Sequence, residues 1–236
     1  MTSPAWTASP CGGLDVELSG SPVTLCLSGA LWMPGDSALV VGDLHLEKGS
    51  AYARRGQLLP PYDTRETLAR LSAEVARRGP KTLILLGDSF HDDQAEARLA
   101  PEDARDLAAL AQGRTLVWVT GNHDEDGPRL APGEVVADLS LAGLTLRHEP
   151  EAGPRPGEVS GHLHPCARIS GPRGQVRRRC FATDGLRLIL PAFGAYAGGL
   201  NLLDPAFEGL FATPPLAGVL GTQRVHAVGR RSLCPD

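Results

Sequence analysis

Short apolar runs recur along the chain, each bounded by glycine, proline or polar turn residues, and they predict β-strands. In the first half these runs alternate with segments of helical periodicity. Leu68, Leu71 and Val75 fall at i, i+3 and i+7, and Gly79-Pro80 ends that segment. The elements predicted for this half are strands at 23–27, 31–33 and 38–42, a helix at 62–78, a strand at 82–86, a helix at 101–110 and a strand at 115–120. This order predicts a parallel sheet with right-handed crossovers.

The second half of the chain is rich in predicted strands joined by glycine-containing turns. A hairpin is predicted around Ala142-Gly143, with arms at 135–141 and 144–148. Further strands are predicted at 158–161, 167–170, 175–182, 186–190 and 225–228. The sequence has no evident repeat or linker, so we expect a single α/β domain over residues 15–236, with two packed sheets and helices outside them. Residues 1–14, dominated by small residues and proline, are expected to form a flexible lead-in.

Composition and charge exclude several classes of protein. With 42% hydrophobic and 21% charged residues in 236, the chain is neither disordered nor of low complexity. The net charge of −4 excludes a generally basic surface but not a locally positive site. Five scattered cysteines without a CxxC pair argue against a disulfide framework or a thiolate zinc site. The N-terminus has no signal-peptide pattern, and proline and glycines interrupt the longest uncharged stretch, residues 188–203. We therefore expect a cytoplasmic protein that does not contact membranes.

The histidines carry the strongest functional signal. Six of the seven lie in or beside five short polar motifs at the ends of predicted strands: Asp43-Leu44-His45, Gly87-Asp88-Ser89-Phe90-His91-Asp92, Gly121-Asn122-His123-Asp124, Arg147-His148 and Gly161-His162-Leu163-His164. Each motif alone is ordinary turn chemistry. Five in succession indicate a shared site, because ligands of open α/β sheets bind at the carboxyl ends of strands.

The types of side chain in these motifs suit divalent transition metals. Carboxylates, an amide oxygen and imidazoles without thiolates match a borderline-hard ion, and there are too many of them for one four-coordinate zinc. In an extended segment, Asp43 and His45 would share one side, as would His162 and His164, whose Cα atoms would then lie roughly 6–7 Å apart. That separation suits two ions roughly 3.5–4 Å apart, each bound by one of these two histidines.

The order DxH, GDxxH, GNHD, a single histidine and GHxH resembles the calcineurin-like metallophosphoesterases over residues 43–164. The resemblance implies a four-layer α-β-β-α sandwich of two packed mixed sheets. It assigns the first metal ion to Asp43, His45, Asp88 and His164. It assigns the second ion to Asp88, Asn122, His148 and His162. His123 would protonate the leaving oxygen or bind the phosphate, and Asp124 would orient His123. The expected cofactors are two Mn²⁺ ions, with Fe²⁺ or Zn²⁺ as alternatives, and a hydroxide that bridges them would attack phosphorus.

Shorter and less specific motifs indicate one branch of these metallophosphoesterases. The segment from Asp43 to Gly49, followed by Pro60 and Asp63-Thr64, is similar to the bacterial ligase-associated DNA-damage-response endonucleases. Only 25 positions separate His123 from His148, which leaves no room for a large inserted domain over the site. The resemblance implies a phosphodiesterase that cuts DNA internally during repair, functionally linked to a DNA ligase and a helicase.

Several roles remain open at the level of sequence. His91, in a GDxFH form similar to that of superfamily nucleases, would contact the substrate or hold Asp88 or a ligand ring in place. Arginines near the motifs are candidates for binding substrate phosphate, with a solvated surface as the alternative: Arg54, Arg168, Arg177 and Arg179. The alternative function is a small-molecule phosphatase or nucleotide phosphodiesterase on the same two metals. A non-catalytic binding module would be marked by lost ligands, and every ligand position is occupied by a suitable residue.

Overall fold

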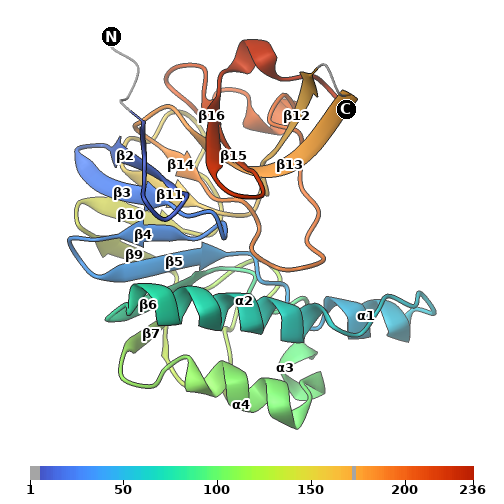
Figure 1. Ribbon diagram of the computed structural model, residues 1–236. Helices are drawn as coiled ribbons and strands as arrows, with labels where there is room; N and C mark the ends of the chain where they lie inside the picture. The colour runs from blue at the N-terminus through green and yellow to red at the C-terminus, as the bar shows by residue number, and fades with distance from the viewer. Residues whose placement is uncertain (1–5, 172–173) are drawn as a thin grey trace.

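The computed structural model describes residues 6–171 and 174–236, which form two facing eight-stranded sheets (Figure 1). Neighbouring strands of the first sheet follow chain order, and the sheet is antiparallel as far as β5 and parallel from β5 to β8. Its strands are β1 (Thr7–Ala8), β2 (Leu14–Leu18), β3 (Ser21–Leu25), β4 (Leu31–Met33), β5 (Ala38–Gly42), β6 (Thr82–Leu86), β7 (Thr115–Val119) and β8 (Glu134–Val136).

All four α-helices belong to the first half of the described chain: α1 (Lys48–Arg54), α2 (Asp63–Arg78), α3 (Ala95–Arg98) and α4 (Pro101–Ala109). In Figure 1 the two longer helices, α2 and α4, run along the side of the first sheet that faces away from the second sheet. Leu68 and Leu71 of α2 and Leu107 of α4 pack there against Leu83 and Trp118 of the sheet. The parallel strands with helical connections that the strand–helix alternation predicted are therefore present.

The second sheet has the strand order β16-β15-β13-β14-β11-β10-β9, with β12 paired to β13. Its strands are β9 (Asp138–Leu141), β10 (Leu144–Arg147), β11 (Glu158–Ser160), β12 (Cys166–Gly171), β13 (Gly174–Thr183), β14 (Leu188–Ile189), β15 (Leu216–Leu220) and β16 (Val225–Val228). Two short 3₁₀ helices accompany it: η1 (Pro205–Phe207) and η2 (Arg230–Ser232).

The alternation of side chains along the strands places the main core between the sheets. Val40 and Ile84 of the first sheet pack toward Leu146 and Phe181 of the second, whereas Leu83, next to Ile84 in the chain, faces the helices. The sequences of these buried strands are continuous apolar runs, because the second sheet covers one face and the helices cover the other. The two-sheet sandwich expected from the sequence is confirmed.

The outer face of the second sheet is covered by η1 and irregular chain rather than by an α-helix. Phe207 and Leu210 are buried there against Ala182. Pro205 and Gly209 lie within this segment, and both disfavour a continuous α-helix.

Some elements were not predicted. Strands β2 and β15 and helices α1 and α3 are short, and β15 contains Gly218. Part of the expected flexible lead-in, residues 1–14, lies outside the described residues. In its described part, Thr7 and Ala8 pair with β2. Every helix in the described ranges is too short or too polar to cross a membrane.

Candidate metal centre

The predicted motifs converge where the two sheets meet. The last residues of β5, β6 and β7, which are Gly42, Leu86 and Val119, are aligned in one parallel register, so the DxH, GDxxH and GNHD motifs begin at one edge. The second sheet brings its own motifs to this edge. The backbone N–H of Gly161 donates to the carbonyl of His148, and the N–H of His162 donates to the carboxylate of Asp43. Five segments far apart in the sequence therefore contribute to one site.

The backbone at five of the seven proposed ligands is left-handed. Asp43 has φ 57°, His45 44°, Asp88 46°, His162 65° and His164 46°. Non-glycine residues adopt this region at a cost, and such residues cluster at functional sites. The extended geometry expected for Asp43–His45 and His162–His164 is therefore wrong, since tight turns rather than a strand bring these side chains together.

Three side chains form the first donor group, which is Asp43, His45 and His164. Their potential ligand atoms all lie within 4.8 Å of one another. The Nε2 atom of His164 is 3.3 Å from Nε2 of His45 and 3.0 Å from Oδ1 of Asp43. The second donor group contains Asp88, His148 and His162, and Asn122 lies against it. Oδ1 of Asn122 is 3.0 Å from Nε2 of His148 and 2.9 Å from Nδ1 of His162.

Asp88 lies between the two groups. Its Oδ1 is 3.3 Å from Nε2 of His148, and its Oδ2 is 3.8 Å from Nε2 of His45. The two oxygens thus face different groups, as the resemblance implied for a bridging carboxylate. His162 and His164 also fall in different groups, one histidine for each.

The donor set fits divalent cations. Ring nitrogens of His148 and His162 lie 3.2 Å apart, and Oδ1 of Asn122 lies within 3.0 Å of both, so three potential ligand atoms face one point. Burial lowers the pKa of His45 to about 3 despite the nearby carboxylates, so this ring is neutral and free to bind a metal. Burial opposes charge on His148 as well, but Asp88 and Asp43 together raise its pKa to about 9. The buried carboxylates thus attract positive charge, which a bound cation would supply.

Three glycines of the motifs let these side chains lie close to the backbone, and a Cβ atom on Gly121 would be 2.3 Å from Oδ1 of Asp88. A Cβ atom on Gly87 would be 2.2 Å from Nδ1 of His148, and one on Gly161 would be 2.4 Å from Oδ2 of Asp43. Gly87 also has φ 73°, whereas Gly161 has an ordinary backbone conformation. At Gly161, the glycine of the GHxH motif, the close contact with Asp43 rather than the backbone conformation therefore requires glycine.

Gly161→Ala is expected to displace Asp43 and to lower the metal content of the saturated protein from about two ions per chain to about one. The cause is steric, because the added methyl group occupies the position of a carboxylate oxygen. Elemental analysis after manganese loading measures this. Gly35→Ala is the matched control, since no atom lies within 4 Å of its added Cβ. Full occupancy in the Gly161 variant would contradict the close approach.

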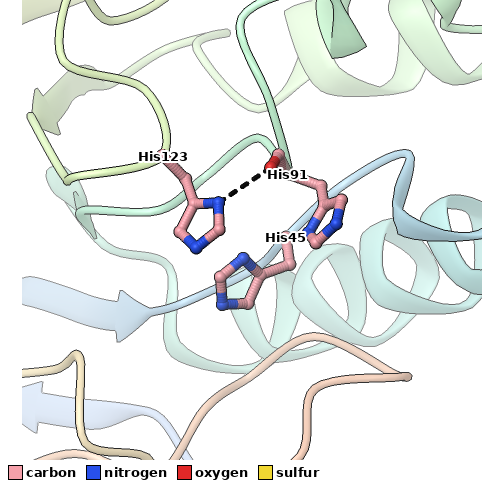
Figure 2. Close-up of side chains that lie close together, drawn as sticks. All are labelled: His45, His91 and His123. Atoms are coloured by element: carbon pink, nitrogen blue, oxygen red, sulfur yellow. Dashed lines mark hydrogen bonds between the residues drawn. The ribbon is translucent and has the colours of Figure 1, made fainter. Parts of the chain in front are cut away.

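His123 stands at the open side of the centre. Its Nδ1–H donates to the carbonyl of His91 over 2.9 Å (Figure 2). This bond turns Nε2 toward Asp88, 3.9 Å from Oδ2. The ring meets that of His45 edge-on, with 5.1 Å between centroids. Potential ligand atoms of His45, His91 and His123 also lie within 4.8 Å of one another, so His123 stands beside the two donor groups and faces the space between them.

Asp124 does not orient His123, contrary to the sequence-based expectation. Its carboxylate accepts hydrogen bonds from the backbone N–H groups of Asp88, Ser89, Phe90 and Gly121, at 2.8 to 3.1 Å. Burial raises the pKa of Asp124 to about 6 against the effect of these N–H groups. Asp124 therefore fastens the loop that carries Asp88 to the loop that carries Asn122. Adjacency in the sequence does not show in which direction a side chain points.

His91 lies at the edge of the centre. Its ring stacks on His123, with 5.4 Å between centroids and 22° between planes, and lies edge-on to His45 (Figure 2). Its buried Nδ1 has no hydrogen-bond partner among the described residues. The backbone carbonyl of His91 holds His123, which is a contact different from both roles considered for the His91 side chain. The ring remains available to the substrate.

The predicted phosphate-binding arginines do not form one patch. Arg54 donates to Gln94, Arg168 donates to the carbonyl of Pro235, and Arg177 pairs with Asp236. Arg179 differs most from the expectation, because its guanidinium donates to five backbone carbonyls between residues 192 and 197.

The loop that Arg179 holds supports the metal centre. The N–H groups of Phe193 and Gly194 donate to the carbonyls of Gly42 and Asp43, so this loop fixes the backbone that carries the first ligand. Arg179 is therefore a positioning residue. Arginine is common on solvated surfaces, and the sequence contained no signal for this buried role.

The branch-specific motifs also have a structural role. Oγ1 of Thr64 accepts from the N–H of Glu47 and donates to its carboxylate, while Asp63 accepts from the N–H of Gly49. These bonds join the start of α1 to the start of α2. The segment after Asp43 and the Asp63-Thr64 pair thus act together, although about 15 positions separate them.

Residues 37–192 match the calcineurin-like phosphoesterase family, so this chain belongs to that family. It is a metal-dependent phosphoesterase, of a family that uses a site for two metal ions. Among solved structures it is similar to a Pseudomonas putida nuclease, MPE, with 28% identity and a TM-score of 0.70 over 92% of this chain and 100% of that one. It also matches Yfce, an E. coli phosphoesterase, with 16% identity and a TM-score of 0.39 over 81% of this chain and 98% of that one. No curated protein matches this chain.

Proposed function

We propose that this protein is a phosphodiesterase dependent on two metal ions that cleaves DNA internally. The observation that carries the proposal is the pair of donor groups joined by Asp88, with Nε2 of His123 directed at them. Asp43, His45, Asp88 and His164 hold one ion, and Asp88, Asn122, His148 and His162 hold the other. Mn²⁺ is the proposed metal, with Fe²⁺ and Zn²⁺ as alternatives for a set of nitrogen and oxygen donors.

The chain's own residues have distinct tasks in this reaction. Divalent ions held here supply Lewis-acid stabilisation of charge at phosphorus and lower the pKa of water. His123, oriented by the carbonyl of His91, donates a proton from Nε2 to the departing oxygen. Asp124 and Arg179 keep the ligand loops in position through backbone hydrogen bonds. His162 and His123 are only partly buried, so a phosphodiester can approach between them.

Two observations favour a polymeric substrate. The connection from Asn122 to His148 contains only β8, β9, β10 and the loops between them, so it holds no inserted domain. A nuclease is among the solved structures that this chain resembles over most of its length. From the resemblance of the motifs, we further propose a role in DNA repair beside a DNA ligase and a helicase.

Covalently closed circular DNA tests the proposal, because only internal cleavage converts it to open circles. With saturating Mn²⁺ the protein is expected to nick such circles, and chelation of the metal is expected to abolish nicking. The same preparation is assayed on bis(p-nitrophenyl) phosphate and on nucleotides. Intact circles beside rapid turnover of small phosphoesters would reject the nuclease and favour the small-molecule alternative.

A further inference from the structure

One face of α1 borders the metal centre and carries unneutralised positive charge. Lys48, Tyr52 and the capping residue Arg55 are spaced i, i+4 and i+7, so they share this face. The segment leading into α1 runs beside the GDxxH loop, where the N–H of His91 donates to the carbonyl of Leu46. Helix α1 therefore begins next to His91.

Aromatic rings connect this face to the reaction centre. The ring of Tyr52 lies 5.9 Å from that of His91, centroid to centroid, and His91 stacks on His123. Nζ of Lys48 lies 5.9 Å from the centroid of Tyr52, within cation–π range. Burial lowers the pKa of His91, and the charges of Lys48 and Arg55 act in the same direction, so both cations lie near this ring.

Neither cation is neutralised by a direct ion pair. Within the described ranges, no carboxylate oxygen lies within 4 Å of the charged group of Lys48 or Arg55. Burial lowers the pKa of Lys48, and the carboxylate of Asp63 on α2 opposes this effect from a longer distance. Beyond them, a hollow of about 400 Å³ continues along α1, lined by Arg54, Arg55, Asp92 and Asp93 among others. Arg98 pairs with Asp92, so Arg54 and Arg55 face one remaining carboxylate of this lining, that of Asp93.

The opposite side of the centre is acidic. A hollow of about 480 Å³ beside Asn122 and His148 is bordered by four carboxylates, those of Glu125, Asp138, Glu149 and Glu151. The arginine in this wall, Arg147, pairs with Asp138 and Glu151. A polyanion is therefore repelled on this side and attracted on the α1 side.

We propose that the face of α1 formed by Lys48, Tyr52 and Arg55 binds the DNA strand beside the scissile phosphate. Lys48 and Arg55 contact backbone phosphates, and Tyr52 stacks against a base or sugar. This inference rests on the proposed nuclease function and adds the path of the strand, which runs from the metal centre over α1.

The test compares two double variants with the same change in charge. Lys48→Met/Arg55→Gln alters the proposed face. Lys81→Met/Arg178→Gln is the control, because Lys81, just before β6, and Arg178, on β13, are exposed residues outside that face. Both are made in a His123→Ala background so that binding is measured without rapid cleavage. Affinity for a single-stranded oligonucleotide is measured from about 50 to 200 mM salt, with metal content and thermal unfolding as checks on folding.

The α1 double variant is expected to bind at least about 10-fold more weakly, and its plot of log affinity against log salt to lose about 1.4 from the slope. The slope separates lost phosphate contacts from a general loss of structure. Tyr52→Leu is expected to weaken binding about five-fold or more without changing the slope. In protein that retains His123, the double substitution Lys48→Met/Arg55→Gln should lower the rate of DNA cleavage at least about 10-fold more than the rate of bis(p-nitrophenyl) phosphate hydrolysis.

Equal affinities and slopes for the two double variants would overturn the assignment of this face. A parent protein that binds DNA through α1 but leaves closed circles intact would support the surface and reject the nuclease function. A parent that does not bind the oligonucleotide would overturn both.

Discussion

Asp88→Asn is expected to cause the largest loss of any single substitution in the metal centre. The two oxygens of Asp88 face the two donor groups, so one change affects both ions. The asparagine amide keeps one oxygen but directs N–H donors at ring nitrogens or at a cation, and it removes a negative charge. We expect metal content to fall from about two ions per chain to below one, and activity to fall by more than the range of about 10²–10⁴ typical of losing a general acid.

Elemental analysis of the manganese-loaded variant, beside hydrolysis of bis(p-nitrophenyl) phosphate, measures both effects. Asp103→Asn is the matched control, because Asp103 is also a buried carboxylate but lies on α4, paired with Arg65. That control should keep two ions. A variant of Asp88 that keeps two ions and most of its activity would show that this residue does not bridge the metals.

His123→Ala is expected to separate acid catalysis from metal binding. The side chain is not in either proposed ligand set, so both ions should remain while the rate falls by about 10²–10⁴. The loss should be smaller for diesters with good leaving groups, such as nitrophenolate, because those oxygens need little protonation. The measurement is kcat on activated and unactivated diesters at equal metal occupancy.

His226→Ala provides the control for this substitution, since His226 is exposed on β16, outside the metal centre. An equal loss on both kinds of diester would assign His123 to binding the phosphate rather than to proton transfer. Loss of a metal ion in the variant would instead make His123 a ligand.

That the proposed ligand residues lie together could be predicted because strand patterns and motifs reinforce each other. Strands β4, β5, β6 and β16 have the residue bounds that their apolar runs predicted. Once β5, β6 and β7 are parallel neighbours, the residues that follow them must meet at one edge. Asp43, Asp88 and Asn122 therefore come together as a consequence of local periodicity.

Roles that depend on the direction of a side chain could not be predicted. Asp124 follows His123 in the chain, but its carboxylate points back to the N–H groups of the Asp88 loop. Arg179 ends a run of three arginines on β13, where residues 174–178 are exposed, and only the packing of the 192–197 loop gives it partners. Helix α1 is too short for its periodicity to be recognised, although it carries Lys48 and Tyr52.

The sequence by itself determined which strands form and which polar motifs end them, because these depend on side-chain alternation and turn chemistry within a few residues. The tertiary structure alone decided which atoms face one another. Left-handed turns at Asp43 and His162, the close approach of Gly161 to a carboxylate, and the carbonyl of His91 that orients His123 all arise from contacts between segments distant in the chain. Such contacts form only when the two sheets pack, because the buried backbone and side-chain groups must then find partners among each other rather than in water.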